Sequence, residues 1–129
     1  MFLIPGFGQN TNEEYFYWLV DLLKKKGFDV VGVPITWNRR IMSDYINEFK
    51  IFFEKNKSKN NYFFFFFYGS VIAISTATEL KPKKIYLCSL SPDFKEDVVN
   101  LKPWLQKLVG KKRIKNSMTR SGREIAKNL

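Results

Sequence analysis

Two polar residues stand where the sequence could support acyl chemistry, the hydroxyl of Ser70 and the carboxylate of Asp93. A serine hydroxyl attacks a carbonyl carbon only when a neighbouring group takes its proton. Histidine is the usual acceptor because its pKa lies near neutrality. The 129-residue chain contains no histidine. A Ser–Lys arrangement is an alternative, but the spacing places no lysine to serve it. The chain alone therefore does not supply a Ser-His-acid triad.

The sequence offers no spaced set of metal ligands. Its single cysteine is Cys88, histidine is absent and the carboxylates are scattered, whereas zinc sites use closely spaced Cys and His. The pair Gly6-x-Gly8 lacks the third glycine of a dinucleotide-binding turn. We therefore expect no metal and no cofactor. A lone cysteine forms no internal disulfide, so nothing indicates an oxidising compartment.

Short apolar runs alternate with helix-like segments along the first ninety residues. The runs at residues 2–4, 30–35, 62–67 and 85–88 predict strands. Residues 11–14 (TNEE) match a capping box and start a helix that ends at Gly27. Further helices are expected from Ser43, and from Gly69 or Ser70. The alternation predicts an α/β fold, a three-layer α/β/α arrangement around a mainly parallel sheet of about four strands. The strand at 62–67 is aromatic on both faces, so we expect helices on each side.

The pattern changes after residue 92. Residues 93–109 predict helical turns interrupted by Pro103, and Ser121 is a candidate cap for a last short helix. No linker or repeat divides the chain. We therefore expect one domain over residues 1–129, with a βα core at 1–92 and a helical, basic segment at 93–129.

The charge is uneven. Nine Lys or Arg and one acid fall in residues 101–129, so this segment carries +8 of the net charge of +10. Such a segment could bind nucleic acid or an acidic membrane surface. It has one nearby aromatic residue, Trp104, and no base-reading motif. We prefer the interpretation of a solvated tail, and nucleic acid is the weaker expectation.

The sequence indicates no targeting or membrane-spanning segment. No basic residue precedes the opening apolar run, as a signal peptide would require. The longest apolar run, residues 62–74, is shorter than the roughly 20 residues of a membrane span. We expect a soluble cytoplasmic protein.

Three segments, taken in order, resemble the α/β-hydrolase superfamily, particularly its small bacterial members. They are Ile4-Pro5-Gly6-Phe7-Gly8, Tyr68-Gly69-Ser70 and the run CSLSPDFKED at residues 88–97. The resemblance covers essentially the whole chain and corresponds to about the first two-thirds of such a domain. It implies descent from a serine ester or acyl hydrolase. The active site is then expected beyond the carboxyl ends of the strands, at residues 5–8, 34–37, 67–70 and 89–94.

The resemblance gives two alignments of the nucleophile elbow, whose pattern is Gly-x-Ser-x-Gly. If Gly69 is the second glycine, the nucleophile position is Phe67 and the first glycine position is Phe65, a large residue that would crowd the turn. On this alignment the elbow has no nucleophile and cannot catalyse acyl transfer. The alternative places the nucleophile at Ser70, flanked two residues away by large side chains, Tyr68 and Ile72. We prefer the alignment on Phe67.

The resemblance also assigns the supporting groups. The backbone N–H of Phe7 corresponds to one oxyanion donor, and that of Tyr68 to the donor that follows the nucleophile. Asp93 lies where a few family members carry their acid. We prefer to interpret Asp93 as the N-cap of the next helix. The family histidine comes from later strands, which this chain does not contain.

These observations lead to three hypotheses. The first is a degenerate or truncated hydrolase-like protein with little or no activity alone, which takes a small acyl or ester substrate only if it is active. The second is a binding protein that uses the basic C-terminal segment. The third is a hydrolase completed by a partner chain or by self-association, because the sheet would end in an open edge at residues 85–88.

Overall fold

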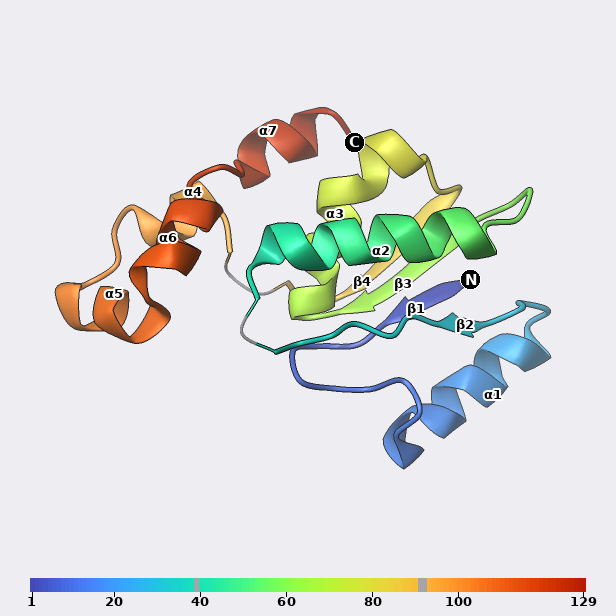
Figure 1. The fold of residues 1–129 in the computed structure, drawn as a ribbon. Coiled ribbons are helices and arrows are strands. Elements are labelled where there is room, and N and C mark those ends of the chain that lie inside the picture. The colour runs from blue at the N-terminus through green and yellow to red at the C-terminus, as the bar shows by residue number, and fades with distance from the viewer. Residues whose placement is uncertain (39, 91–92) are drawn as a thin grey trace.

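The computed structural model describes residues 1–38, 40–90 and 93–129. At its centre is a four-stranded sheet in which all strands run parallel, in the order β2-β1-β3-β4 (Figure 1). The strands are β1 (Phe2–Ile4), β2 (Val31–Gly32), β3 (Tyr62–Phe66) and β4 (Lys84–Cys88). The fold is therefore α/β, as the alternation of apolar runs predicted.

Helices cover the sheet unequally. The long helices α2 and α3 lie on one face and α1 lies on the other (Figure 1). The helices over the sheet are η1 (Glu14–Phe16), α1 (Tyr17–Lys25), α2 (Met42–Asn56) and α3 (Tyr68–Leu80). The C-terminal lobe consists of α4 (Lys95–Val98), α5 (Pro103–Val109), α6 (Lys111–Ser117) and α7 (Gly122–Lys127). Its helices α4 to α6 extend beyond the carboxyl ends of the strands (Figure 1).

The main core lies between the sheet and the pair α2 and α3, and it is built largely from phenylalanine. On β3 the side chains of Phe63 and Phe65 point into this layer and are completely buried. Phe49 of α2 packs edge-on against both rings, at centroid distances of 5.3 and 5.8 Å. Aromatic rings bury large apolar areas and favour such edge-to-face contacts. This aromatic layer fixes α2 and α3 on the sheet.

The opposite face is only partly covered. Helices η1 and α1 bury Phe16, Leu19 and Leu23 against it. Beyond α1, Phe64 stacks on Tyr86 with a centroid distance of 5.8 Å. Tyr86 is 37% exposed. The expectation that helices cover both faces of β3 is confirmed on the side of α2 and α3, where its alternate residues are buried, whereas its side chains on the α1 side are only partly buried.

Several predicted element boundaries are corrected. Thr11 does not cap the first helix, because that helix starts with a 3-10 turn at Glu14, and no side chain caps it. Thr11 is buried and lies against Gly32 instead. Of the strand predicted at 30–35, only Val31–Gly32 forms a strand. The Val33 amide still donates to the Leu3 carbonyl at 2.9 Å, and pairing ends as this edge strand runs into Pro34.

One predicted helix cap, in the C-terminal lobe, is confirmed. Ser121 caps α7 by accepting a hydrogen bond from the Glu124 amide at 3.3 Å, as predicted. The Ser121 hydroxyl also donates to the Glu96 carboxylate, which accepts from the Gly122 amide at 3.1 Å. These hydrogen bonds lower the pKa of Glu96 to about 2, and they join α4 to α7.

Among the described residues, no helix has both the length and the apolar character that a membrane span needs.

Candidate functional site

The sheet order places a topological switch point at the ends of β1 and β3. From β1 the chain crosses to β2 on one side, and from β3 it crosses to β4 on the other. In parallel sheets the loops diverge at such a switch point, and ligand sites lie there. We use the word crevice for this switch point, which lies between residues 5–8 after β1 and residues 67–70 at the β3–α3 turn. Both segments were expected to contribute to the site.

The β3–α3 turn is a strained elbow with Phe67 at its tip. Phe67 has φ 45° and ψ −112°, and a positive φ is rare for a bulky side chain. Its amide donates to the Cys88 carbonyl at 3.2 Å, and its carbonyl accepts from the Ser70 amide at 3.0 Å. These bonds hold a conformation that costs about 1–3 kcal/mol. The turn exposes half of the Phe67 side chain.

Gly69 allows this elbow to lie directly on the end of β1. A Cβ atom at residue 69 would lie 2.5 Å from the Pro5 carbonyl oxygen and 2.8 Å from Cγ2 of Ile4. No side chain fits there. Phe65, expected to crowd the turn, packs in the core against Phe63 at 5.2 Å. The turn therefore has the close backbone contact that an elbow requires, with a large residue two positions before its tip.

The two backbone donors implied by the resemblance flank the crevice. Neither the Phe7 amide nor the Tyr68 amide donates a hydrogen bond to another described residue. Beside them, a Cβ placed on Gly6 would lie 3.3 Å from Cδ2 of Phe67. The Phe67 ring therefore rests against the β1 loop.

Ser70 lies inside the protein. It is completely buried in the first turn of α3, and its Oγ has no hydrogen-bond partner among the described residues. A nucleophilic hydroxyl must be accessible from the crevice, and the Ser70 hydroxyl is not exposed to solvent. The structure thus separates the two alternatives by position, with Phe67 at the exposed tip of the turn and Ser70 in the core.

Asp93 is a buried anchor between the core and the C-terminal lobe. Its carboxylate accepts from Arg120 Nη2 at 2.5 Å, from Ser117 Oγ at 2.9 Å and from the Tyr68 hydroxyl at 3.3 Å. Burial raises the pKa of Asp93, and the Arg120 charge opposes this effect. The N-cap interpretation is wrong, because α4 begins at Lys95 with Phe94 as its N-cap.

An aromatic cluster that the sequence did not reveal lies beside the elbow. Phe7, Trp37, Tyr45 and Tyr68 form a chain of ring contacts with centroid distances from 4.9 to 6.2 Å. The Arg113 guanidinium lies 5.4 Å from the centre of the Phe7 ring, within the range of a cation–π contact. Burial, and then the Asp93 charge, raise the pKa of Tyr68. The cluster fills this end of the sheet with apolar rings.

The described residues around the crevice include no histidine and no cluster of metal ligands. The described residues contain no group of three His, Cys, Asp or Glu side chains able to hold a metal ion. Of the expected segment 89–94, Ser91 and Pro92 lie outside the described residues. The described titratable groups near the elbow include the Tyr68 hydroxyl and Asp93, which is paired with Arg120.

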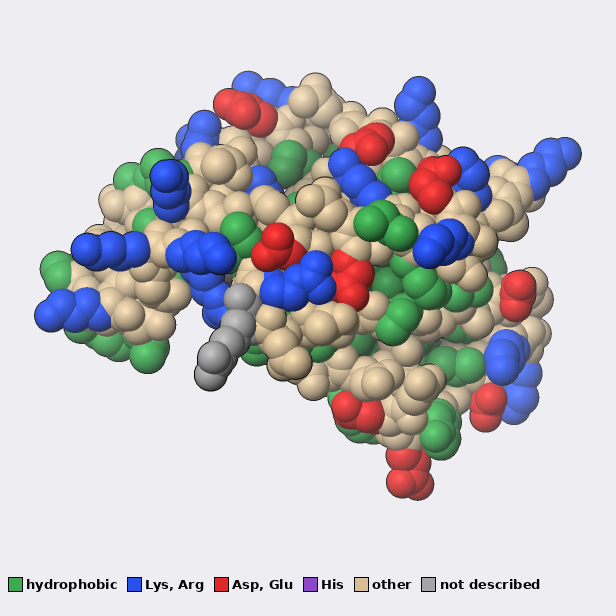
Figure 2. All heavy atoms as spheres, viewed as in Figure 1, with side chains coloured by type: hydrophobic (Ala, Val, Ile, Leu, Met, Phe, Trp, Pro, Cys, Tyr) green, Lys and Arg blue, Asp and Glu red, His purple; other side chains and the backbone are tan. Residues whose placement is uncertain are grey.

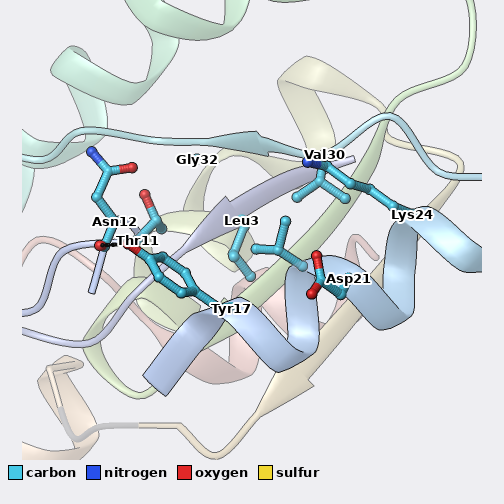
Figure 3. Close-up of a pocket in the computed structure, with 9 residues that line it drawn as sticks. Leu3, Thr11, Asn12, Tyr17, Asp21, Lys24, Val30 and Gly32 are labelled. Carbon is cyan, nitrogen blue, oxygen red and sulfur yellow. Dashed lines mark hydrogen bonds between the residues drawn. The ribbon is translucent and has the colours of Figure 1, made fainter. Parts of the chain in front are cut away.

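A separate cavity of about 370 Å³ lies between α1 and β2, away from the elbow (Figure 3). Its polar side chains include Thr11, Tyr17, Asp21 and Lys24, which come from the β1 loop and α1. Among the described residues that line it there is no serine and no cysteine.

Comparison with known proteins adds no relative: no protein-family model, no curated protein and no solved structure matches the chain.

The elbow geometry predicts an unusual order of stability among variants of Phe67. Phe67→Gly should be more stable than Phe67→Ala by about 1–3 kcal/mol, because only glycine adopts a positive φ without strain. Urea denaturation of both variants measures the difference.

Phe7 provides the matched control, because it is also about half exposed, at 48%, and is not among the residues with positive φ. There Phe7→Gly should be the less stable of its pair, by about 0.4–1 kcal/mol. An alanine at residue 67 as stable as glycine would contradict the elbow.

Proposed function

We propose that the chain is a degenerate hydrolase-like scaffold that keeps the backbone of a nucleophile elbow and has lost the nucleophile. The observation that carries the proposal is Phe67, a half-exposed phenylalanine at φ 45° and ψ −112°. Nucleophile elbows use such a strained strand-to-helix turn to present a hydroxyl. The sheet order and the contact of Gly69 with Pro5 support the same proposal.

The chemistry of acyl transfer explains what this scaffold lacks. The reaction needs a nucleophile at the tip of the turn, a base that takes its proton, and N–H donors for the oxyanion. The amides of Phe7 and Tyr68 are available as donors. Phenylalanine offers no lone pair for attack, and the sequence offers no histidine. We therefore expect little or no ester hydrolysis from this chain.

The Phe67 ring also changes the use of the crevice. Resting against Gly6, it stands where an acyl group would approach the two amides. Together with the exposed ring of Phe7, it makes the crevice a small aromatic surface. On this proposal the crevice provides an aromatic contact surface and does not catalyse ester hydrolysis.

Labelling with a serine-reactive fluorophosphonate tests the loss of activity directly. The folded chain should not be labelled, because Ser70 is buried and no base activates it. Peptide mapping of the treated protein gives the measurement, and Ser70→Ala is the matched variant. Labelling of Ser70, or ester turnover abolished by Ser70→Ala, would overturn the proposal.

A cysteine at the tip of the elbow tests whether the oxyanion donors remain. In a Cys88→Ala background, the thiol of Phe67→Cys should have a pKa about one unit below that of Ile51→Cys, because amides at the start of α3 stabilise a thiolate. Ile51 is an exposed control site within α2. The pH dependence of iodoacetamide alkylation gives both pKa values, and equal values would show that the turn stabilises no anion.

A second proposal concerns the edge of the sheet and supports assembly of two copies of this chain. β4 is at the end of the strand order, and among the described residues no strand pairs with its outer edge. An unpaired edge presents free N–H and C=O groups to another strand. Tyr86 and Leu87 of β4 are 37% and 44% exposed. The uncovered faces of this strand therefore adjoin its free edge.

Antiparallel pairing of two β4 strands about Tyr86 would suit a twofold dimer. Ile85 of one copy would then face Leu87 of the other, and Lys84 would face Cys88. Apolar pairs across strands are favourable, and like charges in direct opposition are not. In this register no two lysines oppose each other.

Light scattering tests this assembly. The wild-type chain should be dimeric, and Leu87→Lys should be monomeric, because it places a charge at the proposed contact. Leu108→Lys is the control, since Leu108 is exposed on α5 and lies outside β4. A monomeric wild-type chain would overturn the second proposal without affecting the first.

A further inference from the structure

Helix α5 is the most exposed apolar element of the C-terminal lobe. None of its residues is buried, and Trp104 and Leu108 are 63% and 78% exposed. These two residues are one helical turn apart, and Leu105 and Val109 adjoin them on the same side, so they form an apolar stripe. α5 packs against α6 at the far end of the lobe from the sheet (Figure 1).

The stripe lies within a strongly basic region. Between Asp97 and Glu124 the sequence has eight Lys or Arg and no acid. Arg120 is buried against Asp93. Figure 2 shows the blue basic side chains gathered over this lobe, with green apolar side chains between them. The basic residues other than Arg120 are Lys102, Lys107, Lys111, Lys112, Arg113, Lys115 and Arg123.

The combination of charge and apolar stripe selects the kind of partner. Lysines alone would suit any polyanion, including nucleic acid. Leu108, however, is aliphatic and does not provide a stacking surface for bases, which aromatic side chains provide. An anionic lipid surface offers both phosphates for lysine and an apolar layer for leucine, and tryptophan favours that interface.

We propose that the α5–α6 lobe docks on an anionic phospholipid surface. Trp104 and Leu108 enter the boundary of the acyl chains, and lysines around them contact the headgroups. The proposal is independent of the state of the elbow, because it uses no residue of the crevice.

The lobe is fixed to the core, so docking would orient the whole protein. Besides the ion pair of Arg120 with Asp93, Asn116 Nδ2 donates to Ser43 Oγ at 2.7 Å. Arg113 of α6 lies over the Phe7 ring at the crevice. Since the lobe extends from the carboxyl ends of the strands, the aromatic end of the crevice would lie near the lipid.

Vesicle co-sedimentation of the full chain tests the proposal. The protein should bind vesicles of phosphatidylcholine and phosphatidylserine and should not bind vesicles of phosphatidylcholine alone. Reversing two charges with Lys111→Glu and Lys112→Glu should weaken binding at least about tenfold. Leu108→Asp should weaken it about tenfold or more, because an apolar contact is replaced by a repelled charge.

Matched control variants lie on α1. Lys24→Glu with Lys25→Glu makes the same change of charge elsewhere on the surface, and Leu22→Asp replaces another exposed leucine, at 44%. Both should bind within about twofold of the wild type, because α1 lies on the opposite side of the sheet from α2 and α3 and outside the basic lobe.

Two results would overturn the proposal. One is vesicle binding that is absent, or that Leu108→Asp leaves unchanged. The other is a duplex of nucleic acid that displaces the protein from vesicles and binds Leu108→Asp as tightly as the wild type, which would assign the lysines to nucleic acid. Circular dichroism of each variant excludes unfolding as the cause.

Discussion

The contact between Gly69 and the end of β1 is the constraint on which this end of the molecule depends. With 2.5 Å between an added Cβ and the Pro5 carbonyl oxygen, any side chain would push α3 away from the sheet. Because glycine stands there, the first turn of α3 lies on β1, and the chain must turn sharply at Phe67 to reach it. The positive φ of Phe67 is thus a consequence of how closely α3 approaches the sheet.

A strained backbone with an inert side chain is informative because strain has a cost. Glycine at residue 67 would remove that cost, and nothing in the contacts of the half-exposed ring requires a bulky residue at a positive φ. The geometry is what a reactive side chain would need, and the residue is one that cannot react. This contrast is the reason to propose a scaffold that has lost its catalytic chemistry. On either side of Phe67, the amides of Phe7 and Tyr68 donate to no other described residue.

The sequence predicted those features whose signals are local. The alternating apolar runs predicted the α/β class and the four strands. Ser121, as a candidate N-cap, predicted the start of α7. The pairing of Asp93 with Arg120 had no such signal, because the two residues are far apart in the sequence and only the fold brings them together. At Thr11 a local signal gave a wrong prediction. Its spacing to Glu14 suits a capping box, but its side chain packs against Gly32. The aromatic cluster at the crevice was missed because Phe7, Trp37 and Tyr68 come from three separate segments.

The position of β1 has a consequence for how the chain acquires its structure. This strand precedes both of its neighbours in the sequence, yet it lies between β2 and β3, and Phe2 pairs with Phe63. One of the two hydrogen-bonding edges of β1 can therefore pair only with residues about sixty positions further along the chain. Parallel pairing over such separations closes a long loop before any contact rewards it, which slows folding. Until the sheet has assembled, the apolar β1 and the all-aromatic β3 are both exposed, and such unpaired apolar strands favour aggregation.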